Sequence, residues 1–221
     1  MEKKNDVSMA VVKRLPKYYR FLVELEKQGV LKVSSNTLAE MMVATASQVR
    51  QDFSCFGGFG QQGYGYNVSQ LKREIETVLG LNKLVRYNAI LVGAGNLGRA
   101  ISWHMDFDDF AITPVAVFDK NPEYIGKKMK TLTIQSINNL EKLCSSININ
   151  LAVLCLPEEE AEEMVDFLYN KCHIKNYWNF TGFDISNKYK DTFSENVYLG
   201  DSLMTLCYRI RHGGKKPPEE I

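Results

Sequence analysis

Apolar residues in the first eighty positions recur every three or four residues, the spacing that places them on one face of an α-helix. Glycines at positions 29 and 80 and capping residues at Ser34 and Thr45 divide the pattern into separate helices. Gln48, three residues after Thr45, completes the sequence of a capping box. The inward positions that we expect are, helix by helix, Tyr18, Leu22 and Leu25; Leu38, Ala39 and Met42; Ala46, Val49 and Phe53; and Leu71, Ile75 and Val78.

The helix that begins after Thr45 has a polar outer face. Arginine and glutamine side chains suit guanine and adenine edges, and serine hydroxyls suit phosphates. A short helix, a tight turn and a second helix with such a face are typical of a helix-turn-helix. An ordinary solvated helix is the alternative. The residues that face outward are Ser47, Gln48, Arg50, Gln51 and Ser54.

Aromatic residues alternate with glycine directly after this helix. Five of the chain's 15 glycines fall between Gly57 and Gly65, which suggests two short strands joined by a flexible tip. A β-hairpin in this place would be a wing that touches phosphates or the minor groove, whereas the alternative is a simple glycine-rich loop. The pattern predicts a winged-helix DNA-binding domain over residues 1–80, with residues 81–86 as a linker.

From residue 86 onward, apolar strands alternate with helices. The apolar run from Ala89 to Val92 leads into Gly93, Gly95 and Gly98 and then into a helix. This is the G-x-G-x-x-G pattern in its expected context: the first glycine permits the turn, the second admits a pyrophosphate, and the third lets the helix pack closely on the strand. It predicts dinucleotide binding at the N-terminus of that helix.

A second strand supports this prediction because it ends in a carboxylate. Asp119 lies 21 positions after Gly98, close to the offset at which an acidic side chain meets the ribose hydroxyls. A carboxylate there favours NAD over NADP, and Lys120 beside it weakens that preference. The alternatives are a degenerate turn that binds no nucleotide, or a site for a CoA-type nucleotide.

The remaining elements extend the sheet. We expect a helix over residues 138–144, strands over 149–156 and 174–180, and a helix after Pro157 whose three first-turn glutamates form a solvated face. Leu156 with Pro157, and Asn179 with Phe180, follow the carboxyl ends of their strands, where doubly wound sheets bind ligands. Residues 86–200 therefore read as a Rossmann-type parallel sheet of an α/β protein.

The last helix, over residues 201–212, carries an unpartnered apolar stripe. Leu203, Leu206 and Ile210 lie on one face and require a surface to cover them, either in a partner or in the same chain. We assign residues 201–221 to this helix and its tail.

Composition narrows the function classes only slightly. The net charge is +1, so it neither proves nor opposes nucleic-acid binding. The five cysteines form no C-x-x-C pair, which argues against zinc and against a disulfide framework. With no signal peptide and no apolar run of membrane-spanning length, we expect a cytoplasmic protein that binds no membrane.

Taken together, the motifs closely resemble those of the redox-sensing transcriptional repressor Rex family, over nearly the whole chain. The stretches that carry the resemblance are Arg14-Leu-Pro-Lys-Tyr18, Val33-Ser-Ser35, Ser47-Gln-Val-Arg-Gln-Asp52, Phe56-Gly to Gly65-Tyr66, Gly93-Ala-Gly-Asn-Leu-Gly98, Phe118-Asp119 and Asn179-Phe180. The resemblance implies a homodimer that binds palindromic operator DNA, is released by NADH and tolerates NAD⁺, and swaps its last helix into the partner subunit. It also implies a switch in which Arg20 pairs with Asp201 in one state only.

The resemblance and the patterns together give the candidate site residues. For NAD or NADH they are Gly93, Ala94, Gly95, Asn96, Leu97, Gly98, His104, Asp119, Lys120, Leu156, Pro157, Asn179 and Phe180; for DNA they are Arg14, Ser47, Gln48, Arg50, Gln51, Ser54, Gly60, Gln62, Gly63 and Tyr66. We expect no catalytic residue and no metal ligand.

Several positions depart from the family pattern. The wing has Gln61 and Gln62 where basic residues are usual, which predicts fewer phosphate contacts and a shallower salt dependence. Gln51 stands in place of a common lysine, Cys55 in place of tyrosine, and His104 in place of a tyrosine near the nicotinamide; Asn179-Phe180 is followed by Thr181-Gly182 rather than Ala-Pro.

Two other function classes compete with the repressor. A small NAD-dependent oxidoreductase needs a proton donor near the nicotinamide, for which His104 is the candidate, and a substrate domain, for which no sequence remains. The other is a nucleotide-binding scaffold without affinity for DNA.

Overall fold

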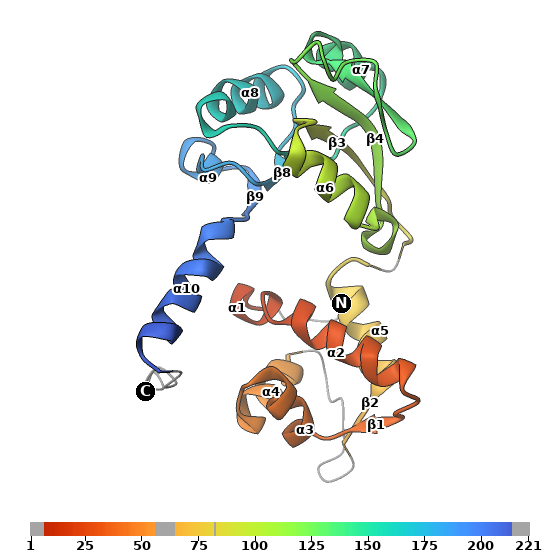
Figure 1. Cartoon of the computed structure of the whole chain (residues 1–221). Helices are drawn as coiled ribbons and strands as arrows, with labels where there is room; N and C mark the ends of the chain where they lie inside the picture. The colour runs from red at the N-terminus through yellow and green to blue at the C-terminus, as the bar shows by residue number, and fades with distance from the viewer. Residues whose placement is uncertain (1–6, 56–64, 82, 214–221) are drawn as a thin grey trace. The chain divides into compact units, whose positions relative to one another are not determined.

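The computed structural model describes residues 7–55, 65–81 and 83–213. The chain divides into two units, Met1–Val85 and Arg86–Ile221, and the boundary falls within the segment that we predicted as a linker. Figure 1 labels the helices and strands of both units. Each unit has its own buried core.

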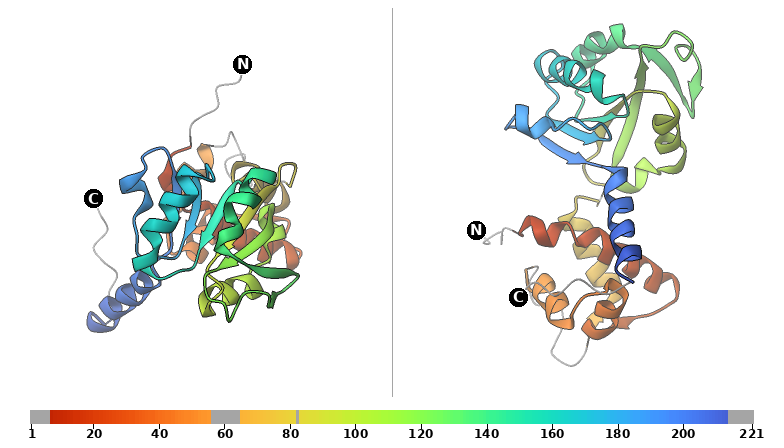
Figure 2. Two further views of the ribbon diagram at one scale, coloured as in Figure 1. Left: turned by 90° about the horizontal axis from the view of Figure 1, so that it is seen from above. Right: turned by 60° about the vertical axis from the view of Figure 1, so that its left-hand side comes forward.

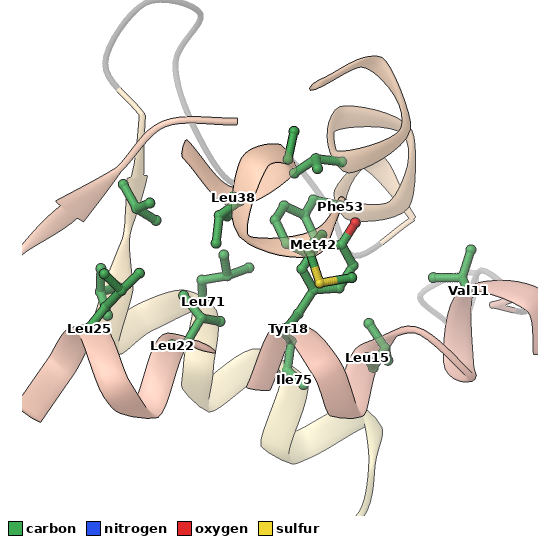
Figure 3. Close-up of a cluster of buried hydrophobic side chains, with 14 residues drawn as sticks. Val11, Leu15, Tyr18, Leu22, Leu25, Leu38, Met42, Phe53, Leu71 and Ile75 are labelled. Carbon is green, nitrogen blue, oxygen red and sulfur yellow. The ribbon is translucent and has the colours of Figure 1, made fainter. Parts of the chain in front are cut away.

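The first unit is a small helical domain with a two-stranded sheet. Its helices pack around a core to which Leu15, Tyr18 and Leu22 of the second helix contribute fully buried side chains (Figure 3). Its elements are α1 (Met9–Val12), α2 (Leu15–Lys27), β1 (Lys32–Val33), α3 (Ser35–Met42), α4 (Ala46–Ser54), β2 (Tyr66–Asn67) and α5 (Val68–Val78).

Side-chain caps begin the helices as expected, with one difference. The hydroxyl of Ser34 accepts a hydrogen bond from the amide of Thr37, and that of Thr45 accepts one from the amide of Gln48. The Gln48 side chain does not close the predicted capping box; it donates to Asp52 instead. A charged acceptor one turn along the helix gives this amide a stronger hydrogen bond.

The end of α5 also differs from the prediction. We expected Val78 to point inward, but it is 39% exposed, while Leu79 packs partly against the core. The prediction was wrong because Val78 is the last helical residue, where the chain turns toward Gly80 (φ +72°).

The strand at the end of the predicted hairpin pairs with a distant segment. β2 is antiparallel to β1, with Val33 opposite Tyr66. A Cβ on Gly65 would lie 2.8 Å from the carbonyl oxygen of Val33, so glycine allows this close approach. The predicted wing tip lies in residues 56–64, outside the described residues.

The second unit is a parallel sheet with helices on both faces (Figure 2). The strand order is β5-β6-β4-β3-β7-β8-β9, and only the short β5 is antiparallel to its neighbour. Helix α6 and the turn η1 cover one face, while α7, α8 and α9 cover the other. The elements are β3 (Tyr87–Val92), α6 (Asn96–His104), η1 (Phe107–Phe110), β4 (Ile112–Asp119), β5 (Lys128–Met129), β6 (Leu132–Ser136), η2 (Ile137–Asn139), α7 (Leu140–Ser146), β7 (Leu151–Leu154), α8 (Glu158–Asn170), β8 (Asn176–Asn179), α9 (Ile185–Lys188), β9 (Phe193–Asn196) and α10 (Leu199–Arg211).

This topology confirms the predicted Rossmann-type fold. The buried residues of β3 and β7 lie at the centre of the sheet, as the apolar runs predicted. The chain leaves β3 for β4 on one side and later returns to β7 on the other, so the direction of winding reverses between β3 and β7. Ligands of doubly wound sheets bind at the carboxyl ends of the strands at this reversal.

Candidate functional site

The glycine turn connects the carboxyl end of β3 to the start of α6. Gly93 has φ +101°, and a Cβ there would lie 2.3 Å from the carbonyl oxygen of Cys155. A Cβ on Gly98 would lie 2.0 Å from the carbonyl oxygen of Gly93, so glycine is needed for the helix to pack this closely on the turn. At Gly95, the cap of α6, a Cβ would meet no atom within 4 Å. The turn is therefore tight on its inner side and open at the position that we expect to face a pyrophosphate.

The carboxylate of Asp119 is bound to the same turn. Its Oδ2 accepts a hydrogen bond of 2.6 Å from the amide of Ala94, and its Oδ1 accepts one of 2.7 Å from the amide of Asn121. Each carboxylate oxygen can accept two hydrogen bonds, so both keep capacity for a ligand hydroxyl. Asp119 thus holds the turn in place and remains able to bind a ribose.

A cavity of about 610 Å³ opens beside this turn, a size in the range of small-molecule sites. Six of the predicted cofactor residues line it, namely Gly93, Gly95, Asp119, Lys120, Leu156 and Pro157. Helices α7 and α8 supply further lining residues that the sequence reasoning missed, among them Leu140, Glu141, Glu160, Glu163, Met164 and Phe167. Their helical spacing gave no signal that they face a ligand, because it equally suits packing on the sheet.

One of the first-turn glutamates has a specific partner. The Lys120 ammonium lies 2.7 Å from Oε1 of Glu160, and both residues line the cavity. A Cβ on Gly182 would lie 2.3 Å from Oε2 of Glu158, so the glycine leaves room for that carboxylate. Glu158 and Glu159 are exposed, as we predicted, but the prediction of only a solvated face was wrong for Glu160.

Asn179 is buried rather than open to the cavity. It is 0% exposed; its Nδ2 donates to the carbonyl of Phe183 and to Oδ1 of Asn196, while its Oδ1 accepts from Thr181. Its carbonyl oxygen accepts from the amide of Val197, two residues before α10 begins. The predicted cofactor residue thus fixes the loop after β8 to the end of β9.

His104 does not reach the cavity of its own chain. It is the exposed last residue of α6, eight positions after Asn96, which at 1.5 Å per residue is about 12 Å along the axis. The chain continues from there to Ile112 at the beginning of β4, and Ile112 lies opposite Tyr87 at the beginning of β3. His104 therefore lies toward the end of the sheet where β3 and β4 begin, whereas the glycine turn lies at their carboxyl ends. Phe180 packs edge-on against Trp178 with a centroid distance of 4.7 Å and does not line the cavity either.

In the first unit, α4 has the polar outer face that we predicted. Ser47, Arg50, Gln51 and Ser54 are exposed. Nη1 of Arg50 donates to the hydroxyl of Ser35 at 3.2 Å, a contact that holds the arginine over the start of α3. The arrangement leaves three polar side chains and one guanidinium on one surface of a short, capped helix.

The inner face of α4 holds a buried carboxylate whose role the sequence reasoning missed. Asp52 is 0% exposed and accepts hydrogen bonds from Nε and Nη2 of Arg14 (2.8 and 2.6 Å), Nε2 of Gln48 (2.8 Å) and the hydroxyl of Tyr18 (3.0 Å). Burial opposes ionisation, but these hydrogen bonds outweigh it and hold the pKa of Asp52 below its ordinary value. An aspartate next to Phe53 on an apolar helix face was the available signal. The cluster attaches α4 to α2.

Two of the predicted DNA-binding residues, Arg14 and Gln48, make hydrogen bonds to Asp52 within this cluster. Arg14 is 35% exposed and uses two of its five N–H donors on Asp52, and Gln48 is half-buried. Tyr66 is half-buried as well and packs edge-on against Phe53 at 5.1 Å. Gly60, Gln62 and Gly63 lie outside the described residues.

Helix α10 contributes no buried residue. Leu203 is 60% exposed, Leu206 51% and Ile210 72%, so the predicted apolar stripe is uncovered in this chain. Arg20 and Asp201 are both exposed, and neither forms an ion pair among residues 7–55, 65–81 and 83–213. In that same part of the chain, no helix is long and apolar enough to cross a membrane.

Comparison with known proteins accounts for both units. A family model described as "Putative DNA-binding protein N-terminus" matches residues 6–54, and one described as "CoA binding domain" matches residues 85–183. Redox-sensing transcriptional repressors Rex from Clostridium botulinum strains Eklund 17B and Hall are each 46% identical to the chain over 210 residues, covering 95% of it and 98% of each relative.

Two solved structures have a similar fold throughout. The crystal structure of RSP in complex with β-NADH has a TM-score of 0.85 and 39% identity, covering 94% of this chain and 96% of that chain. The structure of RSP with β-NAD⁺ and operator DNA has a TM-score of 0.84 and 42% identity, covering 94% of both chains. The chain belongs to the Rex family of redox-sensing transcriptional repressors.

Proposed function

We propose that this protein binds operator DNA through α4 and leaves it when NADH occupies the cavity beside the glycine turn. The observation that carries the proposal is the cavity itself, because Gly95 opens onto it and Asp119 lines it at the carboxyl end of β4. RSP, its structural relative, has been crystallised with β-NADH and with β-NAD⁺ and operator DNA.

The chain's residues fit a dinucleotide. The amides in the first turn of α6 have no partner within the helix and suit a pyrophosphate, and the remaining lone pairs of Asp119 suit two ribose hydroxyls. The bound cofactor would supply its redox state, since the oxidised nicotinamide ring is positively charged and the reduced ring is neutral. Leu156 and Pro157, after β7, line the cavity at the winding reversal.

A path from this edge of the sheet to α10 supports the switch. Asn179 joins the loop after β8 to Asn196 and Val197, and the next residue, Tyr198, is at the N-cap position of α10. A shift of the Asn179 loop therefore moves the start of α10. If NADH weakens operator binding about 100-fold, it must favour the released state by roughly 2.7 kcal/mol.

Fluorescence anisotropy of a labelled palindromic, A·T-rich operator, at fixed salt, tests the proposal. We expect NADH to release the operator and NAD⁺ to leave it bound. Arg50→Ala should weaken operator binding about tenfold and leave NADH affinity unchanged, because a well-placed arginine–base contact contributes about 1–3 kcal/mol. Lys27→Ala removes the same charge from an exposed position of α2 and serves as the control. A wild-type protein that binds NADH yet keeps its operator would contradict the switch.

We further propose that two chains pair through α10. The exposed stripe of Leu203, Leu206 and Ile210 supports this, since so large an apolar face on a terminal helix needs a covering surface. In light scattering after size exclusion, Leu206→Glu should give a monomer at micromolar concentration. Thr205→Glu, on the same helix but off the stripe, should remain a dimer; if both remain dimers, the interface lies elsewhere.

The switch pair is a separate part of the proposal. Arg20 and Asp201 are both exposed and available for an ion pair in one state of a dimer. Asp201→Ala should bind the operator but respond weakly to NADH. Normal release of the operator by this variant would remove the pair from the mechanism.

The oxidoreductase alternative has less support. His104 is about 12 Å along α6 from the glycine turn. The curated relatives of this chain are named transcriptional repressors. Incubation with NADH and small carbonyl compounds should therefore leave the absorbance at 340 nm unchanged.

A further inference from the structure

The cavity is lined by groups of mostly one charge. Asp119, Glu141, Glu160 and Glu163 contribute four carboxylates, and Lys120 contributes the single ammonium group. A 2′-phosphate on the adenosine ribose is a dianion, so its binding depends on a cation near the ribose hydroxyls. Lys120 is the cation among the lining residues; the guanidinium of Arg99, nearby on α6, is engaged with the carbonyl of Ala94 and with the ring of Tyr124.

Lys120 lies at the right place for that contact. It follows Asp119, whose carboxylate stands at the end of β4 where a Rossmann-type site binds the ribose. Left unpaired, a cation in this position would accommodate a 2′-phosphate. Taken alone, Lys120 would thus reduce the discrimination that Asp119 provides.

In the structure, Glu160 forms an ion pair with the Lys120 ammonium. Its Oε1 lies 2.7 Å from the Lys120 ammonium, and it belongs to the first turn of α8, where the helix dipole stabilises a negative charge. The contact joins the residue after β4 to α8, and its two residues are 40 positions apart in the sequence. Lysine has three N–H donors and this pair is partly exposed, so a 2′-phosphate on Lys120 would compete with Glu160 for the ammonium and would have its carboxylate as a close neighbour.

We propose that Glu160 is a specificity residue of the dinucleotide site: by pairing with Lys120 it excludes 2′-phosphorylated dinucleotides and restricts the sensor to NADH. The inference rests on the proposed function, since it assigns the ligand class of the same cavity. Asp119 and Glu160 act on the 2′ position in different ways. Asp119 excludes the phosphate directly, whereas Glu160 occupies the cation that the phosphate needs.

Isothermal titration of the full-length protein with NADH and NADPH tests this. Glu160→Gln keeps the side-chain volume and frees Lys120, so we expect the ratio of NADPH affinity to NADH affinity to rise about three- to tenfold. Glu163→Gln is the matched control, because it removes the same charge from the same helix and cavity without touching the pair. The double variant Lys120→Met/Glu160→Gln should lose the gain. Thermal melting of each variant establishes that it is folded.

The outcomes separate the two proposals. An equal gain in Glu160→Gln and Glu163→Gln would show a general charge effect and overturn the role of the pair, and so would a gain that survives Lys120→Met. Unchanged NADPH affinity in Glu160→Gln, with normal NADH binding, overturns this inference alone. Failure of the wild-type protein to bind NADH would overturn the proposed function and this inference with it.

Discussion

Replacing Asp52 by alanine should destabilise the first unit strongly, and the structure allows the size to be worked out. Asp52 is fully buried and accepts four hydrogen bonds, two of them from Arg14. Removing one partner of a buried ion pair costs roughly 3–5 kcal/mol, because the other charge is left without compensation. Arg14 is 35% exposed and regains water, so we expect the lower end, about 3 kcal/mol. A unit of about 80 residues has a stability of roughly 4–12 kcal/mol, so the loss is a large fraction of it.

Urea unfolding with two probes measures this loss in the intact chain. Both tryptophans, Trp103 and Trp178, lie in the second unit, so their fluorescence reports that unit alone, while far-UV circular dichroism reports both. With an m-value of about 1–1.5 kcal/mol per molar urea, Asp52→Ala should lower the midpoint of the first unit by roughly 2–3 M. The fluorescence transition should not move.

The control is Glu40→Ala, which removes an exposed carboxylate of α3 that forms no ion pair within the described residues. It should change stability by no more than about 0.5 kcal/mol. Equal shifts in the Asp52 and Glu40 variants would refute the reasoning. The pKa of Asp52 is lowered in the folded state, so its contribution is present above the unfolded pKa and is lost as pH falls through the folded value. Asp52→Asn should remove this acid dependence.

Three further predictions concern the second unit. Gly98→Ala forces a Cβ to within 2.0 Å of a turn carbonyl oxygen, so it should reduce NADH affinity at least tenfold in a titration; unchanged affinity would show that the turn can shift freely. Asn196→Ala removes the side-chain bond to Asn179 and should leave NADH affinity within about twofold but reduce the release of operator several-fold in anisotropy; full release would contradict the path to α10. Burial raises the pKa of the Cys155 thiol to about 12, so it should react slowly with an alkylating reagent. In timed alkylation at pH 7.5 followed by mass spectrometry, exposed Cys207 should be modified first and Cys155 should stay intact. Slower modification of Cys207 at high protein concentration would support pairing through α10.

The sequence predicted best those features that the backbone itself requires. Gly93 and Gly98 are needed because other atoms lie where a Cβ would be, and such constraints leave a fixed spacing in the sequence. Asp119 was predictable for the same reason, since it ends a strand beside that turn. Contacts between distant segments were not predictable. The pairing of Tyr66 with Val33 and the ion pair of Lys120 with Glu160 depend on how elements meet, for which local periodicity carries no information.

The residues that we predicted to bind ligands fall into two groups: exposed residues that can contact a ligand, and residues whose hydrogen bonds are made inside the protein. Arg50 is exposed and keeps donors for a ligand, whereas Gln48 and Asn179 already make hydrogen bonds inside the protein. Breaking a buried hydrogen bond to contact a ligand costs about 1–3 kcal/mol, as much as the new contact returns. Such residues therefore contribute by holding a surface in position: Gln48 through Asp52, and Asn179 through the loop that leads to α10. Arg14 belongs to both groups, because its guanidinium holds Asp52 with two donors and keeps others for a phosphate.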